Sequence, residues 1–156
     1  MSDGPGLLNN GLFGFGHTPA SSQLVLVPVP WDVTCSGSGG TSLGPATILE
    51  ASPLLDFYDD DYQGLYTKGV CMLPINETLI QQNSELRKKA DTLIKKQEQG
   101  HPLTVLDNAT LLDINTHCER MTVWVNDAVT SLIKAEKRFG IIGGDHSVIL
   151  GGLQAL

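Results

Sequence analysis

The chain has 156 residues, 41% of them hydrophobic and 17% charged, a composition typical of a single globular domain with a core of its own. Its formal net charge of −7 argues against the clustered Lys and Arg that a phosphate backbone requires, so we expect no nucleic-acid partner. No apolar run approaches the roughly 20 residues that a membrane span requires, so we expect no membrane partner either.

Residues 1–22 are rich in glycine and are predicted to form a flexible arm, while residues 23–156 are predicted to form one α/β unit. The run 24–30 is continuously apolar and rich in valine, which is typical of a strand buried on both faces of a parallel sheet. A glycine-rich loop, residues 31–44, follows it. Pro45 then begins a predicted helix that continues to about Ala51. Residues 53–67 are interpreted as an acidic, solvated loop.

Residues 69–73 form the second predicted strand. Asn76 is a suitable N-cap for a long helix that Gly100 closes, and the basic residues within it, from Arg87 to Lys96, are interpreted as its solvated face. Apolar residues at steps of three and four predict a second long helix over about 110–138. A third short strand, 139–142, precedes a final helix. Strands that alternate with helices predict an α/β fold with a mainly parallel sheet.

Ligands of such sheets bind at the carboxyl ends of the strands, where both unusual loops of this sequence fall. Nucleotide binding is one interpretation of the first loop. However, residues 31–67 contain no lysine, so the phosphate-reaching lysine of a P-loop is absent. Gly37 and Gly39 also lack the third glycine of a dinucleotide fingerprint. Nucleotide binding is therefore the least favoured of the functions considered.

The second loop reads Gly-Gly-Asp-His-Ser over residues 143–147. An imidazole is the commonest side-chain ligand of transition metals, so His146 is a candidate ligand, and Asp145 is a candidate for the carboxylate that orients it. The alternative is a capped helix, with Asp145 or Ser147 as the N-cap and His146 merely half-buried. The other histidines lack a useful spacing: His101 follows a helix-terminating glycine, and His117 is expected near the entry to the second long helix.

Two motifs, in this order, resemble the ureohydrolase superfamily, which includes arginase, agmatinase, formiminoglutamase and guanidine hydrolase. The first is Val-Pro-Val-Pro-Trp-Asp at 27–32, followed by the segment 40–52, and the second is the Gly-Gly-Asp-His-Ser motif. The resemblance covers residues 24–156. Trp31-Asp32 is similar to the agmatinase-like branch, whereas the arm and the loop 34–42 are similar to the guanidine hydrolase group.

The resemblance implies a three-layer α/β/α fold of the arginase type, of which this chain carries the N-terminal part. It also implies two divalent cations, manganese in the first place and nickel as the alternative, and hydrolysis of a guanidinium compound with release of urea. His146 matches a ligand of one cation, and Asp145 matches the carboxylate beside it. No catalytic or substrate-binding residue is assigned. Family members commonly form trimers or hexamers, so a homo-oligomer is expected.

The family's further ligand motifs, Asp-Ala-His-x-Asp and a later Asp-x-Asp, do not follow the Gly-Gly-Asp-His-Ser motif in this sequence. We therefore expect an N-terminal fragment of a ureohydrolase that is inactive by itself and leaves a sheet edge exposed. The alternatives are a non-catalytic scaffold or assembly protein and, last, a nucleotide-binding domain. Three widely spaced cysteines, Cys35, Cys71 and Cys118, match no disulfide or zinc framework and indicate reduced thiols in the cytoplasm.

Overall fold

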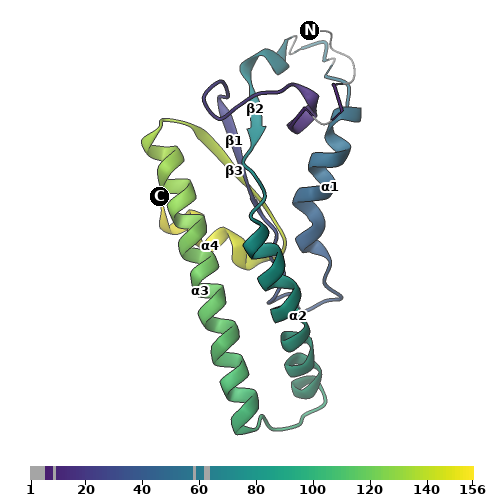
Figure 1. The fold of residues 1–156 in the computed structure, drawn as a ribbon, viewed down its shortest axis with the longest axis vertical. Coiled ribbons are helices and arrows are strands. Elements are labelled where there is room, and N and C mark those ends of the chain that lie inside the picture. Colours follow the sequence, from purple (N-terminus) through teal and green to yellow (C-terminus); the bar gives the residue numbers. More distant parts are fainter. Residues whose placement is uncertain (1–5, 9, 58, 62–63) are drawn as a thin grey trace.

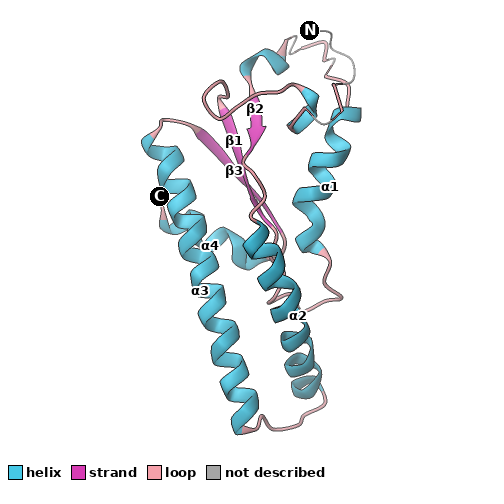
Figure 2. Ribbon diagram, in the orientation of Figure 1, coloured by secondary structure: helices cyan, strands magenta, loops and turns pink. Residues whose placement is uncertain are grey.

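The computed structural model describes residues 6–8, 10–57, 59–61 and 64–156. They form a parallel sheet with helices on both sides (Figures 1 and 2), which confirms the predicted α/β fold. The strands are β1 (Leu24–Val29), β2 (Val70–Met72) and β3 (Arg138–Gly143). The helices are α1 (Gly44–Ala51), α2 (Glu77–Glu98), α3 (Val105–Lys134) and α4 (Ile149–Gln154).

Strand β1 is central, in the order β2-β1-β3, and both of its neighbours run parallel to it. Val29 at the end of β1 is opposite Gly143 at the end of β3. The two strands therefore finish at the same level, and the loops that follow them leave the sheet side by side. Strand β3 is an edge of the described sheet, and most of its residues are half-buried.

The sheet lies between α1 on one side and α3 with α4 on the other (Figure 1). Alternate residues of β1, namely Val25, Val27 and Val29, are fully buried and belong to one core cluster with residues of α2 and α3. Full burial of each such side chain contributes about 1.5–3 kcal/mol. The unbroken apolar character of β1 follows from this position, because both of its faces are covered.

Helix α2 begins as predicted. The side chain of Asn76 accepts hydrogen bonds from the backbone N–H groups of Thr78 and Leu79, at 3.0 and 3.3 Å. The helix ends just before Gly100, whose φ of 73° is the left-handed conformation that favours glycine.

Helix α3 differs from its predicted range of 110–138. It begins at Val105, because Thr104 and Asp107 form a reciprocal capping box, and it ends at Lys134 before Glu136 adopts a left-handed φ of 55°. The expectation that His117 lies near the helix entry is therefore wrong. His117 lies well inside α3, where its Nδ1 is 2.9 Å from the carbonyl oxygen of Asp113.

Part of the predicted N-terminal arm is described, and its Leu12 and Phe15 are buried. The ring of Phe15 lies 4.8 Å from that of Phe57 and 5.7 Å from that of Tyr66, measured between centroids. The flexibility of residues 1–22 stays a prediction, and residues 1–5 and 9 of the arm lie outside the described residues. So do residues 58, 62 and 63 of the predicted acidic loop.

Helix α3 is the longest of the described helices, with 30 residues, but charged side chains recur along it. Within the described part of the chain, no helix combines the length and the apolar character of a membrane span.

Candidate functional site

The loops that follow β1 and β3 enclose an open cleft of about 380 Å³ at the carboxyl edge of the sheet. The cleft is lined by Thr34, Cys35, Ser36, Thr41, Gly144, Asp145, His146 and Ser147. The two unusual loops of the sequence thus lie together at the edge where a parallel sheet places its ligands. Hydroxyl groups, a thiol and an imidazole make the lining rich in hydrogen-bonding groups.

Gly144 brings the two loops into contact. The backbone N–H of Asp145 donates to the carbonyl oxygen of Trp31 at 3.0 Å. A Cβ atom on Gly144 would lie 1.9 Å from that same oxygen, far inside any tolerated contact. Glycine is therefore required here by the close approach of the two backbones.

Asp145 joins the loops through both of its carboxylate oxygens. Oδ2 accepts hydrogen bonds from the backbone N–H and the hydroxyl of Thr34, at 3.0 and 2.7 Å. Oδ1 accepts from the backbone N–H and the hydroxyl of Ser147, at 2.9 and 2.5 Å. Asp145 is thus the N-cap of the 3₁₀ turn His146–Val148, as the capped-helix interpretation predicts, and it also ties that turn to the loop after β1.

His146 is exposed on the wall of the cleft and has no hydrogen-bond partner among the described residues. Both of its ring nitrogens are therefore available to a ligand from outside the described structure. The carboxylate of Asp145 is engaged by Thr34 and Ser147 instead of the imidazole. The predicted role of Asp145 beside a metal ligand stays a prediction.

The donor set of the described residues does not complete a metal site. Nowhere in residues 6–8, 10–57, 59–61 and 64–156 do three or more His, Cys, Asp or Glu side chains gather in a way that could hold an ion. Transition-metal sites use three or four protein ligands. Within this chain, His146 can offer one nitrogen, so the described residues alone do not fit a bound cation, and the assignment of His146 as a ligand stays a prediction.

A buried carboxylate behind the cleft was not singled out as a functional residue by the sequence. Asp32 is 1% exposed, and its Oδ2 accepts hydrogen bonds from the backbone N–H groups of Gly40 and Ser42, at 2.7 and 3.2 Å. Asn83 of α2 donates to its Oδ1 at 3.0 Å. Burial acts to raise the pKa of Asp32, but the hydrogen bonds from Asn83, Ser42 and Gly40 outweigh burial and hold the pKa below its ordinary value.

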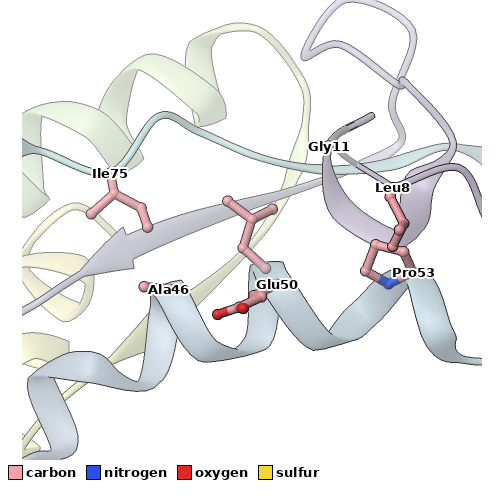
Figure 3. A pocket seen from close by; sticks show the side chains of 7 residues that line it. Leu8, Gly11, Ala46, Glu50, Pro53 and Ile75 are labelled. Carbon is pink, nitrogen blue, oxygen red and sulfur yellow. The ribbon is translucent and has the colours of Figure 1, made fainter.

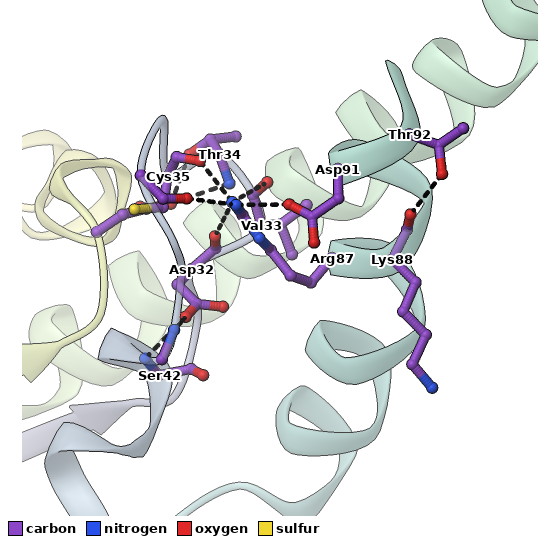
Figure 4. Close-up of polar contacts among 12 residues, drawn as sticks. Asp32, Val33, Thr34, Cys35, Ser42, Arg87, Lys88, Asp91 and Thr92 are labelled. Atoms are coloured by element: carbon purple, nitrogen blue, oxygen red, sulfur yellow. Dashed lines mark hydrogen bonds and ion pairs between the residues drawn. The ribbon is translucent and has the colours of Figure 1, made fainter. Parts of the chain in front are cut away.

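Arg87 corrects the interpretation of the basic residues of α2 as a solvated face. Its side chain is 13% exposed, and its guanidinium donates to backbone carbonyl oxygens of the loop after β1 (Figure 4). Asn83 and Arg87 are one helical turn apart, so both reach the same loop. Asn83, a polar residue within the apolar face of the helix, was the feature of the sequence that could have predicted this contact.

Trp31 and Cys118 meet beneath the cleft. The indole Nε1 of Trp31 is buried and has no hydrogen-bond acceptor of normal geometry among the described residues. Burial is the main cause that raises the pKa of the Cys118 thiol. The neighbouring Trp31 N–H lowers this pKa in part, whereas the negative charges of Asp145 and Glu119 raise it further. Cys118 is therefore held as a neutral thiol, and the described structure assigns it no reactive role.

A larger hollow, of about 570 Å³, lies between α1 and the N-terminal segment (Figure 3). Its described lining is mostly apolar and includes Leu8, Pro53 and Ile75, with Glu50 as the charged member. The hollow does not include residues of the Gly-Gly-Asp-His-Ser turn, so the smaller cleft is the better candidate site.

The fold and the site define the class: an α/β protein whose parallel sheet carries a histidine-bearing glycine turn at its carboxyl edge. Comparison with known sequences identifies the family. The chain belongs to the arginase family, which matches it over residues 22–156. It is 25% identical over 141 residues to an N(1)-aminopropylagmatine ureohydrolase from Synechocystis sp.. The match covers 88% of this chain and 35% of that protein. No solved structure matches the chain significantly. The predicted resemblance to the ureohydrolase superfamily is confirmed.

Proposed function

We propose that this protein is a hydrolase of the ureohydrolase type, which releases urea from a small guanidinium compound. The observation that carries the proposal is His146, which has no hydrogen-bond partner among the described residues and lines the cleft at the shared carboxyl edge of β1 and β3. Membership of the arginase family supports the same reaction class.

We assign the substrate to the agmatine-like compounds or to guanidine itself. The name of the Synechocystis relative supports an agmatine-like substrate. The cleft supports it as well, because its described lining offers the hydroxyls of Thr34, Ser36 and Thr41 but no Lys or Arg that would pair with a substrate carboxylate. Arg87 is already engaged by the loop and by Asp91.

We assign His146 as one ligand of a pair of divalent cations, with manganese first and nickel as the alternative. Two cations would supply activated water for attack on a guanidinium carbon, which plain water attacks poorly. His146 alone does not complete such a site, because no group of three or more His, Cys, Asp or Glu side chains that could hold an ion gathers among the described residues. A homo-oligomer in the cytoplasm completes the proposal, and the free thiols of Cys35, Cys71 and Cys118 support that compartment.

The incomplete donor set of the described residues is compatible with an enzyme fragment and with the alternative of a non-catalytic scaffold. We propose that residues 1–156 alone are inactive. The test is urea release by the purified 156-residue chain from agmatine and from guanidine, with added manganese or nickel. Urea at the level of a protein-free blank supports the proposal. Urea clearly above the blank would show that the chain completes its site without further residues.

A further inference from the structure

The backbone of the loop after β1 converges on one guanidinium group. Nη1 of Arg87 donates to the carbonyl oxygens of Asp32 at 3.0 Å and Cys35 at 2.5 Å, with Val33 at the longer distance of 3.4 Å. Nη2 donates to the carbonyl oxygen of Gly37 at 2.9 Å. One side chain of α2 thus holds most of the segment 32–37 (Figure 4).

We propose that Arg87 is a positioning residue that shapes the cleft and, acting through Thr34 and Asp145, fixes the turn that presents His146. The proposal rests on the proposed function in one respect only, namely the role of His146 as a metal ligand. The mechanical coupling between Arg87 and the turn does not depend on any reaction.

Each step of the coupling is a contact in the structure. Arg87 binds the carbonyls of Val33 and Cys35, which flank Thr34 on both sides. Thr34 in turn donates twice to Asp145 Oδ2. The other carboxylate oxygen of Asp145, Oδ1, accepts hydrogen bonds from Ser147 in the turn beside His146, so the position of Thr34 restrains that of the turn.

The guanidinium group is suited to this task in a way that an ammonium is not. Its planar fork presents five N–H donors in fixed directions, so several carbonyls and a carboxylate can be bound at once. The carboxylate of Asp91, one turn along α2, lies 2.6 Å from Nη2 and orients the fork toward the loop. A lysine would keep the charge but would lose this geometry.

The test measures hydrogen exchange and thiol labelling on the full 156-residue chain without substrate or metal. Arg87→Gln and Arg87→Lys are compared with wild type and with Lys88→Gln, whose exposed side chain is the neighbouring control. We expect labelling of the half-buried Cys35 to rise about tenfold in both Arg87 variants, because hydrogen bonds to a charged group are lost. We also expect faster exchange at the amides of Thr34 and Ser147, which donate to Asp145.

A merely structural role would give a different pattern. Cys71 is buried within strand β2 of the sheet and reports global unfolding, so a labelling rate that rises equally at Cys35 and Cys71 would overturn the proposal. Faster exchange confined to residues 33–37, with Ser147 unchanged, would overturn the coupling. If Arg87→Gln does not fold, Asp91→Asn decides: raised Cys35 labelling with unchanged Cys71 supports the proposal, and wild-type labelling at both contradicts it.

These outcomes are independent of the proposed reaction. A chain that never releases urea can still show the coupling, and an active enzyme can lack it. Failure of this inference and failure of the proposed function are therefore separate results.

Discussion

Asp32 and Asn83 hold each other by two hydrogen bonds across 51 residues of sequence. The backbone N–H of Asp32 donates to Asn83 Oδ1 at 2.7 Å, and Asn83 Nδ2 donates to Asp32 Oδ1 at 3.0 Å. Both residues are buried, at 1% and 7% exposure. The pair fastens the loop after β1 to α2, so the shape of the cleft depends on a helix that does not line it.

Asn83→Ala is expected to destabilise the fold by about 1–3 kcal/mol, because it leaves a buried N–H group and a buried carboxylate oxygen each without a partner. The free energy of unfolding from urea denaturation measures the change. Gln81→Ala is the matched control, since Gln81 is exposed on the same helix. Equal stability of the two variants would contradict the importance of the pair.

The stability that Asp32 provides is expected to depend on pH. Its pKa is lowered in the folded chain, so its contribution is present above the ordinary aspartate pKa of about 3.9 and is lost as the pH falls through the folded value. The measurement is the difference in unfolding free energy between wild type and Asp32→Asn from pH 7 to pH 3. We expect this difference to shrink below about pH 4. A difference that stays constant over the range would show that the charge of Asp32 is irrelevant.

Gly144→Ala is expected to lower the free energy of unfolding by about 1–3 kcal/mol or more. The new Cβ atom would lie 1.9 Å from the carbonyl oxygen of Trp31, so the two backbones must move apart. Gly37→Ala is the control in the opposite loop, where a Cβ atom would meet nothing nearer than the Cys35 sulfur at 3.9 Å. Thermal unfolding of both variants tests this. Similar melting temperatures for the two variants would contradict the close approach of the loops.

Local signals in the sequence predicted much of the fold. The apolar run of β1, the Asn76 cap of α2 and the glycine after α2 each act within a few residues, so their consequences could be read directly. The start of α3 could not. Val105 and Leu106 are 88% and 76% exposed, so the first turn breaks the apolar spacing, and its capping box uses Asp107 where Glu or Gln is usual.

The position of the candidate site could also be predicted in part from local signals. Both loops follow predicted strands, and the parallel sheet necessarily brings their starts together. The partners within the site are long-range: Thr34 and Asp145 are 111 residues apart, and Cys35 and Arg87 are 52 apart. The sequence of a basic helix face does not distinguish an arginine that binds a loop from one that is solvated.

The most direct test of the proposed function compares His146→Ala with wild type in the protein isolated at its native length, measuring bound metal and urea release together. We predict that the variant loses at least one divalent ion per chain. We also predict that urea release falls more than about 100-fold, beyond the loss expected when a residue that only orients a metal ligand is replaced. His101→Ala, at an exposed histidine that does not line the cleft, serves as the control. Wild-type metal content together with wild-type urea release in His146→Ala would contradict the role of His146 as a metal ligand.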